Sequence, residues 1–251
     1  MRPMLFAFIA VILLYAGLCG YLYANQRAMI YHPELVAMPR IRPAMTLPTG
    51  AGPVFVSTRE HDGPKAAIYF GGNADDVALF VSDFAQAFPD RALYLLHYRG
   101  YGGSAGSPSE SALLADARAL FDRVHALHPE IVLVGRSLGS GIAVHLASER
   151  PVEKLILVTP YHSLQGIAAE QFPWAPVRLL MRDKYESWKY AADVTAPTRL
   201  IVAERDEIIP RASSERLRAA FKKVQPEYVV IAGADHNTIS ESPQYLDLLG
   251  R

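Results

Sequence analysis

One serine of this sequence stands in a pattern that suits a nucleophile. Residues 135–139 read Gly-x-Ser-x-Gly with Ser137 at the centre, after an apolar run and before a helix-like stretch. Between a buried strand and a helix, this pattern forms a tight turn in which both glycines avoid collisions with their neighbours. The turn exposes the serine hydroxyl and directs the positive end of the helix toward it. A nucleotide-binding turn is excluded, because the segment has neither a P-loop lysine nor Gly-x-Gly-x-x-Gly.

A serine becomes an effective nucleophile only when a base accepts its proton. At sites built on this turn, the chain order is serine, acid, histidine, so the base must follow Ser137. Three of the eight histidines do so, namely His145, His162 and His236. His145 lies too far along the expected helix to reach back, and His162 begins an insertion where it could line a pocket. His236 lies in a short loop after the last expected strand, so we predict that it is the base.

The acid that orients the base is expected after the strand at 199–203. Three carboxylates follow this strand, at Glu204, Asp206 and Glu207. We predict Asp206 as the acid that fixes the tautomer of His236, because it lies in the loop between strand and helix. Glu204 is expected on the strand itself and Glu207 in solvent. The preceding strand end, at 158–161, contains no carboxylate.

Acyl chemistry also needs two hydrogen-bond donors for the oxygen of a tetrahedral intermediate. We expect the backbone N–H of Leu138, next to the nucleophile, to be one donor. The loop Gly71–Asp75 follows an early apolar run, and its glycines let the backbone approach a substrate closely. We therefore predict the backbone N–H of Asn73 as the second donor. The alternative for this loop is an ordinary glycine turn.

To lie close together, these candidate site residues must follow strands that end at one edge of a sheet. The spacing of apolar residues predicts such strands. Apolar runs separated by amphipathic stretches favour an α/β fold with a mainly parallel sheet and helices on both faces. The stretch 161–195 interrupts the alternation and is predicted as a small insertion over the top of the sheet. The expected strands are 54–57, 66–70, 92–97, 131–135, 155–158, 199–203 and 228–231, and the expected helices are 75–88, 109–127, 137–149 and 211–224.

The N-terminal segment has a different character. No residue from Met4 to Tyr23 is charged, and a helix of this length spans roughly 30 Å, the thickness of a bilayer core. We predict a single-pass transmembrane anchor at 4–23, with the side of the membrane left open by the flanking charges. A cleaved signal peptide is the alternative, although its apolar region is usually only about 7–15 residues long.

Five prolines lie in residues 24–53, which we predict to be an extended membrane-proximal arm before a catalytic domain at 54–251. Because the predicted site lies wholly inside that domain, removing residues 1–24 is expected to release an active soluble form. The same truncation is expected to reduce activity on membrane substrates if the rim of the pocket contacts the bilayer.

Composition narrows the class of partner. The 251 residues suit one large α/β domain, and 25 basic residues balance 25 acidic ones. This balance argues against a nucleic-acid partner. The single cysteine, Cys19, cannot form an internal disulfide. Neither a metal nor an organic cofactor is indicated, and the oligomeric state cannot be read from the sequence.

Five short motifs belong together. They are Gly-Asn-Ala at 72–74, Tyr-Arg-Gly-Tyr-Gly-Gly-Ser at 98–104, Gly-Arg-Ser-Leu-Gly at 135–139, Arg-Asp-Glu-Ile-Ile-Pro at 205–210 and Gly-Ala-Asp-His-Asn at 233–237. With these motifs the chain resembles the membrane-anchored α/β-hydrolases that have little or no cap, whose eukaryotic relatives include lipid hydrolases and protein depalmitoylases. One position departs from the pattern, since Gly71 stands where such proteins usually carry histidine. That histidine supports the loop and does no chemistry, so its absence does not exclude activity.

The resemblance implies hydrolysis of an ester, thioester or related acyl bond in a small-molecule or lipid substrate, through an acyl-enzyme on Ser137. Pocket walls are expected from residues 161–190, where Phe172, Trp174, Leu179 and Leu180 suit acyl groups. Two alternatives remain. An acyltransferase would use the same triad with an alcohol in place of water. A membrane-tethered binding protein without activity would have no need for an intact triad.

Overall fold

One sheet organises the protein, for which a computed structural model describes residues 2–36 and 45–251. Within these residues the strands lie in the order β1-β2-β4-β3-β5-β6-β7-β8. The first two pairings in this order are antiparallel, and all pairings from β4 to β8 are parallel. The strands are β1 (Met45–Thr49), β2 (Gly52–Arg59), β3 (Lys65–Phe70), β4 (Ala92–Leu96), β5 (Glu130–Arg136), β6 (Lys154–Val158), β7 (Thr198–Ala203) and β8 (Glu227–Ile231).

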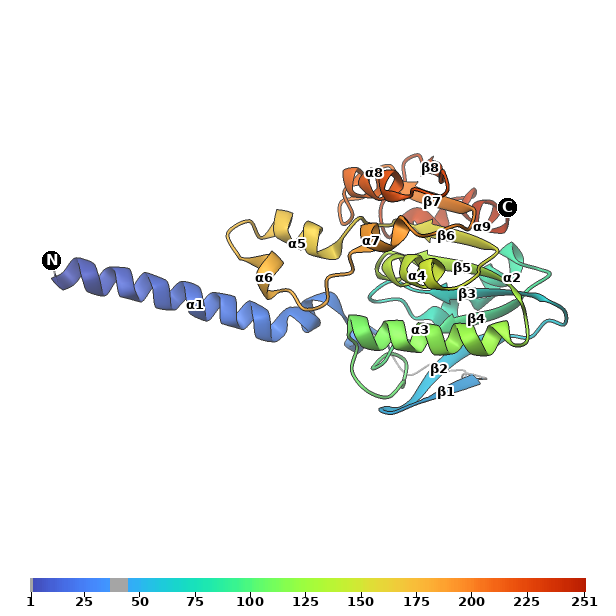
Figure 1. Cartoon of the computed structure of the whole chain (residues 1–251), viewed down its shortest axis with the longest axis horizontal. Helices are drawn as coiled ribbons and strands as arrows, with labels where there is room; N and C mark the ends of the chain where they lie inside the picture. Colours follow the sequence, from blue (N-terminus) through green and yellow to red (C-terminus); the bar gives the residue numbers. More distant parts are fainter. Residues whose placement is uncertain (1, 37–44) are drawn as a thin grey trace.

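Helices cover both faces of this sheet (Figure 1). One face packs against α3 (Glu110–His125), α4 (Leu138–Glu149), α7 (Ser187–Ala191) and α8 (Arg211–Ala220). The other packs against α2 (Val81–Ala87) and α9 (Tyr245–Gly250). In the described part of the chain there are also three short 3-10 helices, η1 (Pro33–Leu35), η2 (Val77–Phe80) and η3 (Thr238–Glu241).

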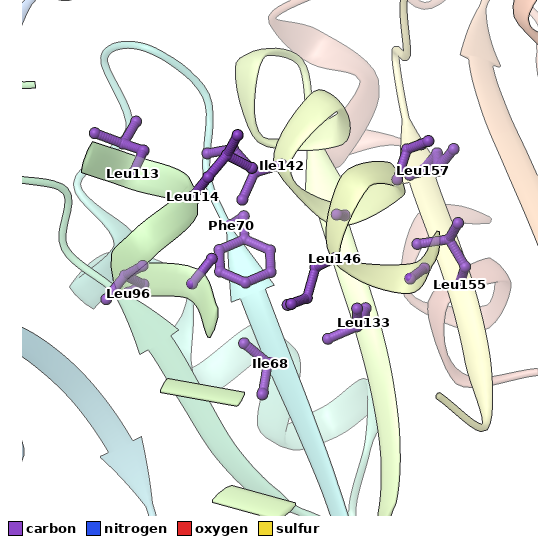
Figure 2. Close-up of a cluster of buried hydrophobic side chains, with 14 of the residues drawn as sticks. Ile68, Phe70, Leu96, Leu113, Leu114, Leu133, Ile142, Leu146, Leu155 and Leu157 are labelled. Carbon is purple, nitrogen blue, oxygen red and sulfur yellow. The ribbon is translucent and has the colours of Figure 1, made fainter. Parts of the chain in front are cut away.

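The central strands are mainly apolar because each of their faces meets a separate core. In β3, Ile68 and Phe70 belong to one buried cluster, whereas Ala67 and Tyr69 belong to the other. Figure 2 shows the first cluster, in which Phe70 lies among side chains from α3 and α4. Side chains that alternate between two buried faces leave few positions for polar residues on a strand. The predicted mainly parallel sheet with helices on both faces is therefore confirmed.

All seven expected strands are present, and β1 is an additional one that the sequence pattern does not indicate. Pro48 in this segment argues against a strand, because proline has no backbone N–H to donate. However, β1 lies at the edge of the sheet, where proline is tolerated. Leu47 opposite Val54 is buried and fixes β1 to the core.

The segment predicted as an extended arm at 24–53 has more structure than expected. The N-terminal helix α1 (Arg2–Ile30) continues without a break through the predicted anchor and into this segment. Residues 45–53 contribute β1 and the start of β2, and residues 37–44 lie outside the described residues. Within the described residues, α1 is the helix long and apolar enough to cross a membrane.

The insertion expected at 161–195 carries α5 (Leu164–Gln171), α6 (Val177–Leu180) and α7. Of these helices, α7 packs against α4 and α8. Figure 1 shows α5 and α6 beyond the sheet on the side from which α1 extends. Hydrogen bonds from Tyr15 to Trp174 and from Gln26 to Leu180 join α1 to this part of the insertion.

Candidate active site

Ser137 occupies the turn between β5 and α4, as the Gly-x-Ser-x-Gly pattern predicts. Its backbone angles are φ 48° and ψ −117°, a conformation that residues other than glycine rarely adopt. Strain of this kind collects at functional sites because the surrounding structure imposes it. A β-carbon on Gly135 would lie 2.5 Å from the carbonyl oxygen of Gly139, and one on Gly139 would collide with the carbonyl of Phe70. Both glycines are therefore required by the packing.

Ser137, His236 and Asp206 form a continuous hydrogen-bonded chain. The Oγ of Ser137 lies 3.0 Å from Nε2 of His236, and Nδ1 of His236 lies 2.9 and 3.0 Å from the two carboxylate oxygens of Asp206. A carboxylate only accepts, so Nδ1 carries the ring proton and Nε2 accepts from the serine hydroxyl. The parallel strands β5, β7 and β8 all end at one edge of the sheet, which brings the three residues together.

The loop after β7 holds Asp206 rigidly. Its Oδ1 accepts hydrogen bonds from the backbone N–H groups of Ile208 at 3.0 Å and Ile209 at 2.7 Å, and its side chain is 1% exposed. Glu204 instead accepts from the N–H of Gly233 at 2.7 Å, and Glu207 is exposed. Of the three carboxylates, the structure places Asp206 against the imidazole.

The two other histidines after Ser137 have different surroundings. His145 stacks on Tyr190, with 3.7 Å between ring centres, and its Nε2 lies 2.9 Å from Glu149. His162 stacks on Trp188. Burial lowers the pKa of both rings. Neither is hydrogen-bonded to Ser137 within the described residues.

The two predicted oxyanion donors, Asn73 and Leu138, line the same cavity as Ser137. The N–H of Gly139 donates to the carbonyl of Gly71 at 3.1 Å, which fixes one loop against the other. The backbone carbonyl of Asn73 accepts a hydrogen bond from the hydroxyl of Tyr101. The side-chain amide of Asn73 donates to the carbonyl of Ile30. In residues 2–36 and 45–251, no acceptor is found for the backbone N–H of Asn73 or Leu138.

A buried ion pair that the sequence patterns do not single out joins the loops of the site. The guanidinium of Arg136 lies 2.7 Å from the carboxylate of Asp75 and also donates to the carbonyl of His236 at 3.2 Å. Asp75 accepts in turn from the N–H of Gly72 at 2.7 Å and from the hydroxyl of Tyr69 at 3.1 Å. Burial alone lowers the pKa of Arg136, but the charge of Asp75 and other neighbours raise it by more, so Arg136 stays charged.

A cavity of about 370 Å³ lies in front of Ser137, and its walls are mainly apolar. Phe172 and Leu180 of the insertion line it, as the sequence suggests, whereas Trp174 and Leu179 are exposed. The other wall comes from α1, which the sequence does not predict. Its contributing residues are Leu22, Tyr23, Gln26, Met29 and Ile30.

Comparison with known proteins identifies the group to which this architecture belongs. The family model described as "Serine aminopeptidase, S33" (Hydrolase_4) matches residues 70–187. An uncharacterized protein of Mycobacterium tuberculosis is 36% identical over 256 residues, covering 94% of this chain and 88% of the relative.

Two solved structures show the same fold. The mouse alpha/beta hydrolase domain-containing protein 10 has a TM-score of 0.63 at 19% identity, covering 82% of this chain and 94% of its own. A monoacylglycerol lipase from Paleococcus ferrophilus has a TM-score of 0.60 at 16% identity, covering 79% and 95%. On the nearly full-length mycobacterial match, the family match and the fold, this chain belongs to the α/β-hydrolases, in one family with the mycobacterial protein.

Proposed function

We propose that the protein is a membrane-anchored serine hydrolase that cleaves an ester, thioester or related acyl bond through an acyl-enzyme. The observation that carries this proposal is the hydrogen-bonded chain from Ser137 through His236 to Asp206, which faces an apolar cavity. A strained serine next to a correctly oriented base is what nucleophilic acyl chemistry requires.

In the first half-reaction, Oγ of Ser137 attacks the substrate carbonyl while Nε2 of His236 takes the hydroxyl proton. The backbone N–H groups of Asn73 and Leu138 stabilise the resulting oxyanion. The bond to the leaving group then breaks, and His236 returns the proton to the departing alcohol or thiol. This leaves the acyl group as an ester of Ser137.

In the second half-reaction, a water molecule donates a proton to His236 and attacks the acyl carbonyl. Collapse of the intermediate breaks the ester bond to Ser137, which regains its proton, and releases a carboxylic acid. Asp206 stabilises the imidazolium in both halves without becoming protonated itself. The water must reach the carbonyl from the side of His236.

We further propose that residues 4–23 anchor the protein in a membrane and that the hydrolase domain follows at 54–251. Large apolar side chains such as Met4 and Leu14 are 77% and 76% exposed along α1, which is unfavourable in water and favourable in lipid. Residues 24–36 and 45–53 then connect the two parts as the end of α1 and as β1, in place of a loose arm.

Labelling with a fluorophosphonate probe tests the proposed function. The wild type is expected to react, and mass spectrometry is expected to find the phosphonyl group on Ser137. The variant Ser137→Ala should not react, whereas Ser148→Ala in the helix that follows should react like the wild type. Labelling that persists in Ser137→Ala would contradict the proposal. Adding an alcohol to the assay separates hydrolysis, which yields the acid, from acyl transfer, which yields a new ester.

A further inference from the structure

The C-terminal half of α1, from Tyr15 onward, is hydrogen-bonded to the insertion at several points. Tyr15 donates through its hydroxyl to the carbonyl of Trp174 at 2.9 Å. The side-chain amide of Gln26 donates to the carbonyl of Leu180 at 3.3 Å, and its oxygen accepts from the N–H of Arg182 at 2.7 Å. These contacts place α1 and residues 174–182 side by side, as Figure 1 also shows for α6.

Further contacts hold the base of α1 against the domain. Arg27 pairs with Asp183 at 2.9 Å, and the hydroxyl of the buried Tyr31 lies 2.8 Å from that of Tyr185 and 3.3 Å from Asp183. Together these contacts hold the C-terminal end of α1 against the domain. The depth of α1 in a membrane therefore sets the depth of the insertion.

That depth follows from the length of the apolar stretch. Tyr15 lies eight residues before Tyr23, which is about 12 Å along a helix. If Trp174 stayed outside the hydrocarbon, the apolar part between Arg2 and Tyr15 would span only about 18 Å of the roughly 30 Å that a bilayer core requires. The anchor fits the bilayer only when the insertion around Trp174 lies inside the lipid.

The surface of the insertion suits this position. Trp174 is 46% exposed and Leu179 is 81% exposed, although both are large apolar side chains. Residues 171–177 carry no charge, and the exposed Arg178 has a stem long enough to bring its guanidinium to the lipid phosphates. The nearest acidic residue before this stretch, Glu170, pairs with Arg216 of α8 at 3.1 Å.

The cavity in front of Ser137 lies between these two membrane-facing parts. Leu22 and Tyr23 of α1 form one wall, and Phe172 and Ala175 of the insertion face them. Its volume of about 370 Å³ is at the low end for ligand pockets, which are about 300–1,000 Å³, and suits one acyl chain better than two. Of the α1 residues that line the cavity, Leu22 and Tyr23 belong to the segment 4–23 that is expected in the bilayer.

We propose that an ester with a single acyl chain reaches Ser137 directly from the bilayer, between α1 and the insertion, so that α1 is one wall of the substrate site. This inference rests on the serine hydrolase function proposed above. Most residues that line this route are apolar, and Ser137 lies at its end. The carbonyl is attacked by Ser137, the C–O bond breaks, and the alcohol leaves with the proton from His236.

The position of the insertion can be measured without any assay of activity. The protein has two tryptophans, so the variant Trp188→Phe leaves Trp174 as the only one. In vesicles of phosphatidylcholine brominated on the acyl chains, the fluorescence of Trp174 is expected to be quenched, while acrylamide in the water phase quenches it weakly. Quenching by acrylamide alone would overturn the proposal.

The route of the substrate is tested on full-length protein in vesicles of ether-linked phosphatidylcholine, which resists hydrolysis. The readout is kcat/KM on p-nitrophenyl palmitate in the vesicles divided by kcat/KM on water-soluble p-nitrophenyl acetate. Leu22→Trp narrows the cavity and Leu179→Asp places a charge in the lipid, and each should lower this ratio about tenfold. Two matched controls, Leu14→Trp in α1 and Leu127→Asp after α3, replace exposed leucines outside the cavity and should leave the ratio unchanged.

The outcomes separate this inference from the proposed function. If the wild type hydrolyses the acetate and neither Leu22→Trp nor Leu179→Asp lowers the ratio, the membrane route is wrong and the serine hydrolase function stands. If the wild type hydrolyses neither ester and is not labelled by a fluorophosphonate, the proposed function fails and this inference fails with it.

Discussion

The guanidinium of Arg136 lies 2.7 Å from the carboxylate of Asp75, and this buried pair connects three loops of the candidate site. Through it, the loop that carries Asn73, the turn that carries Ser137 and the carbonyl of His236 are hydrogen-bonded to one another. The pair contains no group that faces the substrate cavity. We expect the pair to hold the proposed base and a proposed oxyanion donor at fixed distances from Ser137.

Asp75→Asn is therefore expected to lower kcat on short p-nitrophenyl esters by about tenfold to a hundredfold, with little change in KM. The amide leaves Arg136 as an uncompensated buried charge, which costs roughly 3–5 kcal/mol of stability. Kinetics and thermal denaturation should be measured together, below the melting temperature of the variant. The pair has no positioning role if the folded variant keeps the kcat of the wild type. Asp76→Asn, at the neighbouring N-cap of η2, is the matched control.

The three carboxylates after β7 should differ sharply in their effect on the rate. Asp206→Asn is expected to lower kcat by several orders of magnitude, because the amide no longer fixes the proton on Nδ1 of His236. Glu204→Gln and Glu207→Gln should stay within a few-fold of the wild type, since neither side chain contacts the imidazole. Steady-state kinetics on p-nitrophenyl butyrate measures all three. A larger loss for Glu204→Gln than for Asp206→Asn would reject the assignment of the acid.

Two truncations of α1 should have different effects on the protein. Removing residues 1–24 deletes Leu22 and Tyr23 from the cavity wall but retains Arg27 and Tyr31, which bind the domain. The shortened protein is expected to be soluble and to hydrolyse p-nitrophenyl acetate, with activity on membrane esters lost. Removing residues 1–31 also deletes the buried Tyr31 and should destabilise the domain by about 3–5 kcal/mol.

The anchor itself is tested on the uncut protein. Full-length protein is expected to stay with membranes during carbonate extraction, and mass spectrometry of the membrane fraction should find residues 4–23 intact. A mature chain that begins near Gly20, or intact protein in the soluble fraction, would favour a secreted enzyme and reject the anchor.

A buried histidine outside the site predicts how stability changes with pH. Burial lowers the pKa of His97 to about 4 from its ordinary value of 6.5, and its Nε2 lies 2.8 Å from the hydroxyl of Ser57. Since the folded state holds His97 neutral, the unfolded state binds the extra proton between these two values. The contribution of His97 is complete above pH 6.5 and is lost as the pH falls toward 4, by roughly 3 kcal/mol in total.

Urea denaturation at several pH values checks this. The wild type should lose stability between pH 6.5 and 4, and His97→Gln should lose less over the same range because its side chain does not titrate. Equal slopes for the two proteins would show that His97 is not held neutral in the folded state.

Local patterns and chain order were enough to predict most of the fold, but contacts between distant residues were not. The turn at Ser137 is a property of five consecutive residues, and the order of His236 and Asp206 in the chain indicated where to look for partners. The ion pair of Arg136 and Asp75 joins residues 61 positions apart and has no sequence signal except two charges near glycines.

Two other features depend on packing that no local pattern reports. The wall that α1 contributes to the cavity follows from where the helix lies, and its residues read only as part of an apolar anchor. At Gly71, a β-carbon would lie 2.9 Å from a methyl group of Val77, so a histidine there would require the loop to shift. This contact gives a physical reason for the departure from the pattern of the resembling hydrolases.

The central claim is that Ser137 is the nucleophile, and its removal tests this most directly. Ser137→Ala is expected to lower kcat on p-nitrophenyl butyrate by several orders of magnitude while its circular dichroism and melting temperature match the wild type. His236→Ala should be nearly as damaging, and the double variant should be no worse than either single one, because the two residues act as a unit. A correctly folded Ser137→Ala variant that turns over the ester at the rate of the wild type would contradict the account.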